Sequence, residues 1–136
     1  MTMGRTIPAF PARDVVAAVA FYRERLGFEA LHHDGGFAVL RRDDAVLHLW
    51  ESADRSWASR PASGEGPVRS GAESFLAGTA SCRIEVTDVD ALYAEMQAAG
   101  VLHPVSDSVD TTDFGTREFH VLDLDGNLIG FHTWVD

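Results

Sequence analysis

Residues 12–28 read ARDVVAAVAFYRERLGF, and residues 86–101 read VTDVDALYAEMQAAGV. Both stretches have an Asp-Val pair as their third and fourth residues. Apolar side chains spaced three and four residues apart follow the pair, and a glycine stands next to the end of each stretch. This pattern predicts two amphipathic helices, each with an aspartate as N-cap and a glycine at its C-terminal end. The caps are Asp14 and Asp88, and the stops are Gly27 and Gly100.

Strand-like stretches flank the two helices in the same order. A short apolar stretch precedes each helix, and runs rich in β-branched and aromatic residues follow it, joined by turns such as Asp34-Gly35-Gly36. We expect strands at Ile7–Phe10, Phe28–His33, Phe37–Arg42, Ala45–Trp50, Cys82–Val86, Phe119–Leu122 and Leu128–Trp134. The sequence therefore predicts an α+β fold made of two βαβββ modules.

The two modules form one predicted domain over residues 1–136. We place module one at about residues 5–52, a flexible insertion rich in Ser, Gly and Pro at about 53–78, and module two at about 79–136. A half-sheet with a single helix cannot enclose a core by itself. The two modules must share a core, either within one chain or between two chains.

Composition limits the classes of function. The chain has 136 residues, of which 46% are hydrophobic and 24% charged, and its formal net charge is −10. This composition is typical of a globular protein, and such a charge disfavours binding to nucleic acid. There is no apolar run long enough to cross a membrane and no apolar signal segment, and the single cysteine, Cys82, cannot form an internal disulfide. We therefore expect a cytoplasmic protein without membrane or nucleic-acid partners.

Several local motifs resemble those of one superfamily. They include Arg13-Asp14-Val15, Arg25-Leu26-Gly27-Phe28, Gly115-Thr116-Arg117-Glu118-Phe119 and Asp125-Gly126-Asn127. Together with the paired modules they resemble the vicinal oxygen chelate superfamily, and within it the bleomycin resistance proteins. The resemblance covers nearly the whole chain outside the insertion. It implies cup-shaped sheets and a homodimer that exchanges its N-terminal strands, with Pro8 at the position of the hinge.

The resemblance also gives a test for a catalytic metal. The enzymes of the superfamily hold a divalent ion with His and Glu side chains, and those positions fall here at Ile7, Ser81 and Gly130. These residues do not supply a ligand set, apart from the weak hydroxyl of Ser81. The six histidines show no HxH or HExxH spacing. We therefore predict no catalytic residue, no metal and no cofactor.

The resemblance suggests a ligand-binding cup with aromatic walls and acidic groups. Phe37 and Phe114 stand at or near aromatic positions of the resembled proteins, and His32 replaces a second aromatic. Trp50 and His48 are candidates for the floor because they share one face of their strand. The carboxylates of Asp110 and Asp113 are candidates for holding a cationic tail. The predicted binding residues are Phe37, Trp50, Phe114, His32, His48, Asp110 and Asp113.

These expectations lead to a non-catalytic binding protein that sequesters bleomycin-type glycopeptides and so confers resistance. Such ligands carry a flat bithiazole and a cationic tail, which aromatic surfaces and negative potential would recognise. Two alternatives stay open. One is a metal-dependent enzyme of the glyoxalase or dioxygenase kind with a displaced ligand set. The other is a binding module for a different aromatic natural product.

Overall fold

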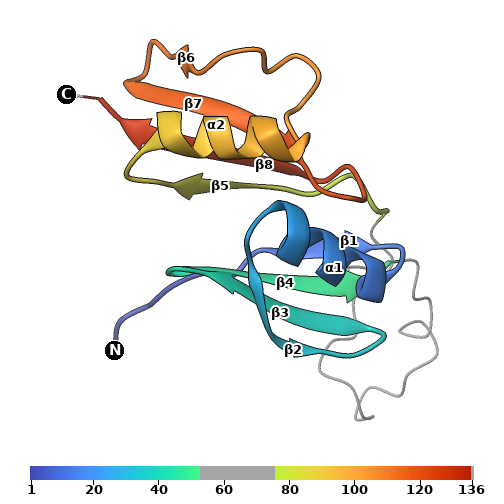
Figure 1. The fold of residues 1–136 in the computed structure, drawn as a ribbon. Helices are drawn as coiled ribbons and strands as arrows, with labels where there is room; N and C mark the ends of the chain where they lie inside the picture. Colours follow the sequence, from blue (N-terminus) through green and yellow to red (C-terminus); the bar gives the residue numbers. More distant parts are fainter. Residues whose placement is uncertain (53–75, 136) are drawn as a thin grey trace.

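The computed structural model describes residues 1–52 and 76–135, and these residues form two modules of the same design (Figure 1). Each module is a four-stranded sheet with one helix. Module one contains β1 (Ala9–Ala12), α1 (Val15–Arg25), β2 (Glu29–His33), β3 (Phe37–Arg42) and β4 (Ala45–Glu51). Module two contains β5 (Ser81–Glu85), α2 (Val89–Ala99), β6 (Asp110–Thr111), β7 (Thr116–Leu122) and β8 (Leu128–Trp134). Residues 53–75 of the insertion predicted at 53–78 lie outside the described residues.

The strand order confirms the paired βαβββ modules. Sheet 1 runs β1-β4-β3-β2 and sheet 2 runs β5-β8-β7-β6, with a parallel first pair and antiparallel pairs after it in both sheets. Strand β6 was not among the strands expected from sequence, because Asp110–Thr111 is a two-residue exposed edge strand inside a polar stretch. Short edge strands carry no apolar alternation, so the hydrophobic pattern does not reveal them.

Both helices begin at the predicted caps. The side chains of Asp14 and Asp88 each accept a hydrogen bond from the backbone N–H three residues further on, at 3.0 Å. Helix α2 ends at Gly100, whose φ of 73° lies in the left-handed region. Helix α1 is capped instead by Leu26 in a right-handed conformation, and the left-handed turn follows at Gly27. The glycines thus reverse the chain, which a residue with a Cβ would do only with strain.

One apolar core serves both modules. Phe10 and Tyr22 of module one and Met96 and Phe119 of module two belong to the same buried cluster. The two modules therefore share their core within a single chain, which decides between the two arrangements that the sequence left open.

The described residues include no helix of the length and apolarity needed to span a bilayer.

A buried polar network ties the modules together at the 123–127 turn. The hydroxyl of Tyr22 donates to Asp123 Oδ2 at 2.7 Å, and the side-chain amide of Asn127 donates to the carbonyl of Pro11 at 2.9 Å. Asp123 Oδ1 also accepts from the backbone N–H groups of Asp125 and Asn127, both at 2.9 Å. These bonds satisfy polar groups that would otherwise be costly to bury between two sheets.

The first strand begins later than predicted, at Ala9 instead of Ile7. Proline has no N–H to donate, but the carbonyl of Pro8 accepts a 2.9 Å bond from the N–H of His48 and marks where pairing with β4 starts. The preceding segment is exposed, including Met1, Met3 and Ile7. Figure 1 shows this N-terminal segment leaving β1 and pointing away from both modules.

Candidate functional site

Each sheet has one face covered by its helix and one face without such cover. In sheet 1 the residues Ala38, Leu40, Leu47 and Leu49 are buried on the side of α1. Because side chains alternate along a strand, the residues between them point to the opposite side, which we name the open face of sheet 1. In sheet 2, Phe119 and Phe131 are buried on the side of α2, and the alternate residues form the open face of sheet 2.

The open face of sheet 1 carries the predicted aromatic cluster. The ring of Phe37 lies 5.0 Å from that of His48 at an interplanar angle of 81°, and 6.0 Å from that of His32. Trp50 is the direct partner of Phe37 across β3 and β4, and Val39 is that of His48. Four of the predicted binding residues therefore occupy one apolar, partly exposed surface with a phenyl ring at its centre.

The polar groups of this surface differ in charge. Burial lowers the pKa of His48 below its usual value, which favours the neutral imidazole beside Phe37. His32 is exposed, and its Nε2 lies 3.3 Å from Asp34 Oδ2. The backbone N–H of Gly36 lowers the pKa of Asp34 by hydrogen bonding to its carboxylate. The surface thus combines an uncharged middle with a fixed negative charge at one end.

The other three predicted binding residues lie on module two. Phe114 is 60% exposed, and Asp113 is exposed beside it in the turn between β6 and β7. Asp110 lies on β6, opposite Glu118 of β7. The seven predicted residues are therefore divided between two sheets, and no hydrogen-bonded strand pair joins those sheets within the described part of the chain. A cup that used all seven would need the two open faces to be brought together.

The open face of sheet 2 is more polar than that of sheet 1. The Nη2 of Arg83 donates to Glu118 Oε2 at 2.6 Å, whereas Arg117 points elsewhere and pairs with Asp90 of α2, also at 2.6 Å. His120 is opposite Gly130, and Glu118 is opposite His132, so the two imidazoles lie on one face but not directly across from each other.

The three positions that the resemblance assigns to metal ligands carry no set of ligating side chains in the described structure. Ile7 lies in the exposed N-terminal segment, Ser81 is the first residue of β5, and Gly130 lies on β8. The ring of His120 occupies the space beside Gly130, where an added Cβ would stand 3.1 Å from its Cδ2. Within residues 1–52 and 76–135, no group of three His, Cys, Asp or Glu residues is placed to hold a metal ion.

The single thiol also lacks the properties of a nucleophile. Cys82 is half-buried in the apolar core, and burial raises its pKa to about 11. A thiol with such a pKa is almost entirely protonated near neutral pH, and the thiolate is the reactive form. Cys82 thus packs against the core as a small apolar residue.

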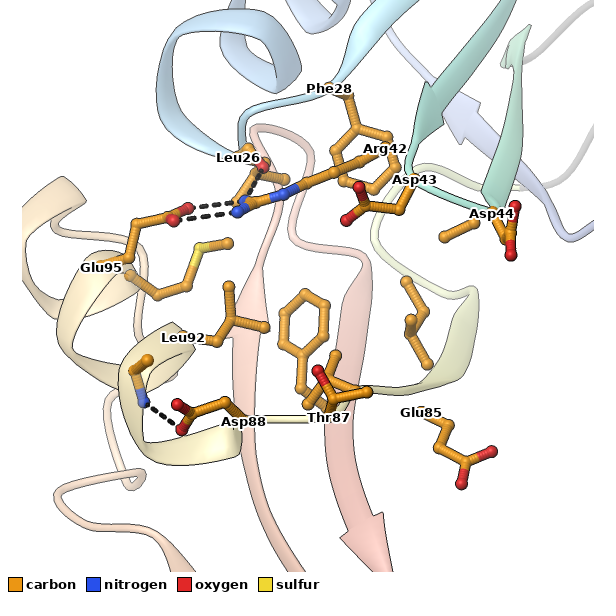
Figure 2. A pocket seen from close by; sticks show the side chains of 16 residues that line it. Leu26, Phe28, Arg42, Asp43, Asp44, Glu85, Thr87, Asp88, Leu92 and Glu95 are labelled. Carbon is orange, nitrogen blue, oxygen red and sulfur yellow. Dashed lines mark hydrogen bonds and ion pairs between the residues drawn. The ribbon is translucent and has the colours of Figure 1, made fainter.

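A cavity of about 620 Å³ lies between the modules, away from the predicted binding residues (Figure 2). Its apolar part is formed by core side chains such as Leu26, Phe28, Met96 and Phe131. Acidic residues from both modules are among those that line it, as Figure 2 shows: Asp43, Asp44, Glu85, Asp88 and Glu95.

Arg42 is the basic residue in the lining of this cavity, and it is already engaged. Its guanidinium binds both oxygens of Glu95, at 2.6 and 2.9 Å, and donates to the carbonyl of Leu26 at 2.9 Å. The cavity therefore keeps a net negative rim. No local sequence pattern indicates this cavity, because its walls come from core positions of both modules and only their packing leaves the space between them.

Comparison with known proteins places the chain among a defined set of relatives. Residues 6–131 match the family model described as Glyoxalase/Bleomycin resistance protein/Dioxygenase superfamily. A bleomycin resistance protein of Geobacillus stearothermophilus is 47% identical over 129 residues, which cover 95% of this chain and 96% of the relative. A bleomycin resistance protein of Klebsiella pneumoniae is 27% identical over 127 residues, covering 90% and 86% of the two chains.

Solved structures are similar over the same length. A bleomycin-binding protein from the bleomycin-producing Streptomyces verticillus, complexed with copper(II)-bleomycin, has a TM-score of 0.70 and 30% identity, and the match covers 100% of this chain and 99% of that one. A bleomycin-binding protein complexed with bleomycin has a TM-score of 0.69 at 22% identity, covering 96% and 98%, and it supports the fold.

Proposed function

The chain belongs to the glyoxalase/bleomycin resistance protein/dioxygenase superfamily, and on this premise we propose that it is a bleomycin-binding protein that confers resistance by sequestration. The observation that carries the proposal is the near-half identity to a curated bleomycin resistance protein, because that identity extends through both modules. Binding withholds the drug in proportion to the amount of protein, so no chemical conversion is needed. An intracellular location belongs to the same proposal.

The open face of sheet 1 supports binding of a flat heterocycle. Phe37 presents a ring that is held edge-on by His48, with Trp50 as its neighbour across the strands. Aromatic rings prefer offset or edge-to-face neighbours, and such contacts add to the gain from apolar burial. We propose that Phe37 and Trp50 bind the heterocycle, that Phe114 adds a wall from module two, and that Asp110 and Asp113 attract the cationic tail.

The non-catalytic part of the proposal is supported by the position of His120. Its ring fills the space beside Gly130, one of the three positions that the resemblance assigns to metal ligands, so a longer side chain there would have to displace it. We propose that the protein needs no metal of its own. Purified protein containing stoichiometric zinc, nickel or iron, lost together with a measurable turnover, would contradict this.

A homodimer is the arrangement that would bring the two open faces together. We propose that two copies exchange their N-terminal segments at Pro8, so that sheet 1 of one copy faces sheet 2 of the other. The apolar side chains of this segment are exposed, with Met3 96% and Ile7 48% accessible, and Arg5 adds positive charge. The cavity between the modules offers apolar walls and a negative rim of matching character.

Titration calorimetry with metal-free bleomycin tests the binding proposal, and light scattering tests the dimer. We expect saturation near one ligand per chain and a mass of two chains, whereas a variant lacking residues 1–7 should be folded but largely monomeric. The absence of heat at high micromolar drug would overturn the bleomycin proposal in favour of another ligand. A full-length monomer at the same concentration would overturn the exchange.

A further inference from the structure

Trp134 is a large aromatic side chain that remains exposed at the end of β8. It is 58% accessible and lies on the open face of sheet 2, two residues after His132. The imidazole of His132 stands edge-on to the indole, with the ring centroids 5.7 Å apart and the planes at 86°. The indole is thus supported from one side by a partly buried ring, while much of its own surface faces solvent. The indole thus presents a flat apolar surface with a polar N–H to solvent.

The exposed indole belongs to the same end of sheet 2 as Phe114. Trp134 is the cross-strand partner of Thr116, and the N–H of Val135 donates to the carbonyl of Gly115 at 2.9 Å. These contacts fix the end of β8 beside the residues that follow Phe114. Phe114 is the one aromatic residue of module two among the predicted binding residues, so Trp134 adds a second aromatic at that end.

Carboxylates flank His132, the residue that lies next to Trp134 on the open face of sheet 2. His132 lies between Glu85 of β5 and Glu118 of β7, and Glu118 is in turn opposite Asp110 of β6. Arg83 is the basic residue of this part of the face, and it is bound to Glu118. Three carboxylates against one guanidinium leave a net negative surface next to the indole.

From this arrangement we infer that Trp134 is a specificity-determining residue for the cationic part of the ligand, with His132 as the residue that positions its ring. The inference rests on the proposed function. A cation placed over an indole is attracted by the negative face of the ring, and nearby carboxylates add to that attraction. The more apolar face of sheet 1 is left to hold the flat heterocycle.

The Nδ1 atom of His132 fits this supporting role. It is buried and has no hydrogen-bond partner among the described residues, so at this atom the imidazole is held by packing alone. A ring fixed in this way limits the positions that the indole can adopt. Pre-ordering of a binding side chain reduces the entropy that ligand binding must overcome.

The experiment compares two ligands with four proteins. The ligands are metal-free bleomycin and the corresponding bleomycinic acid, in which the cationic tail is replaced by a carboxyl group. The proteins are the parent, Trp134→Ala, Trp134→Phe and Leu124→Ala, a control that removes an apolar side chain of 50% exposure from the 123–127 turn. Calorimetry gives Kd for each pair, and circular dichroism verifies the fold.

We expect Trp134→Ala to raise Kd for bleomycin about 3- to 30-fold, the range of a partly desolvated cation–π contact. Trp134→Phe should cause a smaller loss, and Leu124→Ala should stay within about twofold of the parent. With the acid, Trp134→Ala should change Kd less than about twofold, because the cation is gone.

Equal losses with both ligands, or no loss with either, would overturn the role of Trp134 while the parent still bound bleomycin and the proposed function stood. If the parent itself binds neither ligand, the proposed function fails and this inference fails with it.

Discussion

The imidazole of His120 lies against the backbone of Gly130, close enough that a Cβ at position 130 would stand 3.1 Å from Cδ2 and 3.2 Å from Nε2 of the ring. The two residues are direct partners across β7 and β8. A Cβ at position 130 would therefore force the ring of His120 to shift by a few tenths of an ångström.

This relationship predicts a coupled stability effect. Gly130→Ala should lower the free energy of unfolding by about 1 kcal/mol, because the ring of His120 must move to admit the methyl group. The double variant with His120→Ala should recover most of that loss, since neighbouring residues are not additive. Urea unfolding of the four proteins measures the coupling. A Gly130→Ala variant as stable as the parent would show that the ring moves freely.

Loss of the aromatic walls should weaken binding without unfolding the protein. Phe114→Ala should cost about 1–3 kcal/mol of binding free energy, or about 5- to 150-fold in affinity, because stacking and apolar burial are both lost. Phe37→Ala should add some loss of stability, since this ring packs against two imidazoles. Val105→Ala, which truncates a side chain of 80% exposure, is the control. Unchanged affinity of a folded Phe114→Ala would exclude that residue from the site.

The acidic residues near Phe114 should act on the rate of capture. Asp110→Asn and Asp113→Asn remove exposed charges, so we expect slower association and a weaker dependence of that rate on salt. Dissociation should change little, in contrast to the aromatic variants. Stopped-flow fluorescence at several ionic strengths separates the two rates. A pure change in dissociation would indicate a direct contact with the ligand.

The buried carboxyl of Asp123 should make the free energy of unfolding decrease as the pH rises above the ordinary pKa of an aspartate. Burial raises the pKa of this carboxyl, against the hydrogen bonds from Tyr22 and Asn127. The folded state then holds a proton that the unfolded state has already lost, so stability is highest below the unfolded pKa and declines through the folded one.

Tyr22→Phe tests this relationship, because it removes the 2.7 Å bond that favours the charged carboxylate. We expect a loss of about 1–3 kcal/mol at neutral pH, the cost of an unpaired buried group, and a smaller loss at pH 4. Urea unfolding at both values measures it, with Tyr93→Phe on α2 as the matched control. An equal loss at both pH values would show that the ionisation of Asp123 does not contribute to the effect of Tyr22→Phe.

Arg42 should contribute more to stability than its neighbour Arg41. Arg42 joins β3 to Glu95 of α2 and to the carbonyl of Leu26, whereas Arg41 pairs with Glu29 on the adjacent strand at the surface. We expect Arg42→Met to cost about 1–2 kcal/mol and Arg41→Met less than about 0.5 kcal/mol. Thermal unfolding measures both. Equal losses would show that the contact between modules adds nothing beyond a surface ion pair.

The local features of the fold could be predicted from the sequence because they depend on nearby residues. The caps at Asp14 and Asp88 and the apolar spacing of both helices are properties of stretches shorter than 20 residues. The strands were predicted from the same kind of local pattern, except for the edge strand of sheet 2. The strand at Asp110–Thr111 was missed because pairing with β7, and not its own composition, makes it a strand.

The candidate site was predicted in part. His48 and Trp50 share a face, as their spacing indicates, and Phe37 lies beside His48 because β3 and β4 form a short hairpin. Trp134 was not selected, although it is an aromatic residue in a predicted strand. Its significance depends on its exposure and on the cross-strand arrangement of His132, Glu85 and Glu118, which no local pattern contains.

The sequence by itself determined the two βαβββ modules, their helices and the family to which they are similar, because short-range periodicity and capping specify these features. Only the tertiary structure decided that both modules share one core in a single chain, that the predicted binding residues fall on two separate sheets, and that a cavity with an acidic rim lies between them. These features arise from contacts between residues as distant in the chain as Pro11 and Asn127. Such contacts depend on how the modules pack, and the pattern of either module alone does not contain that information.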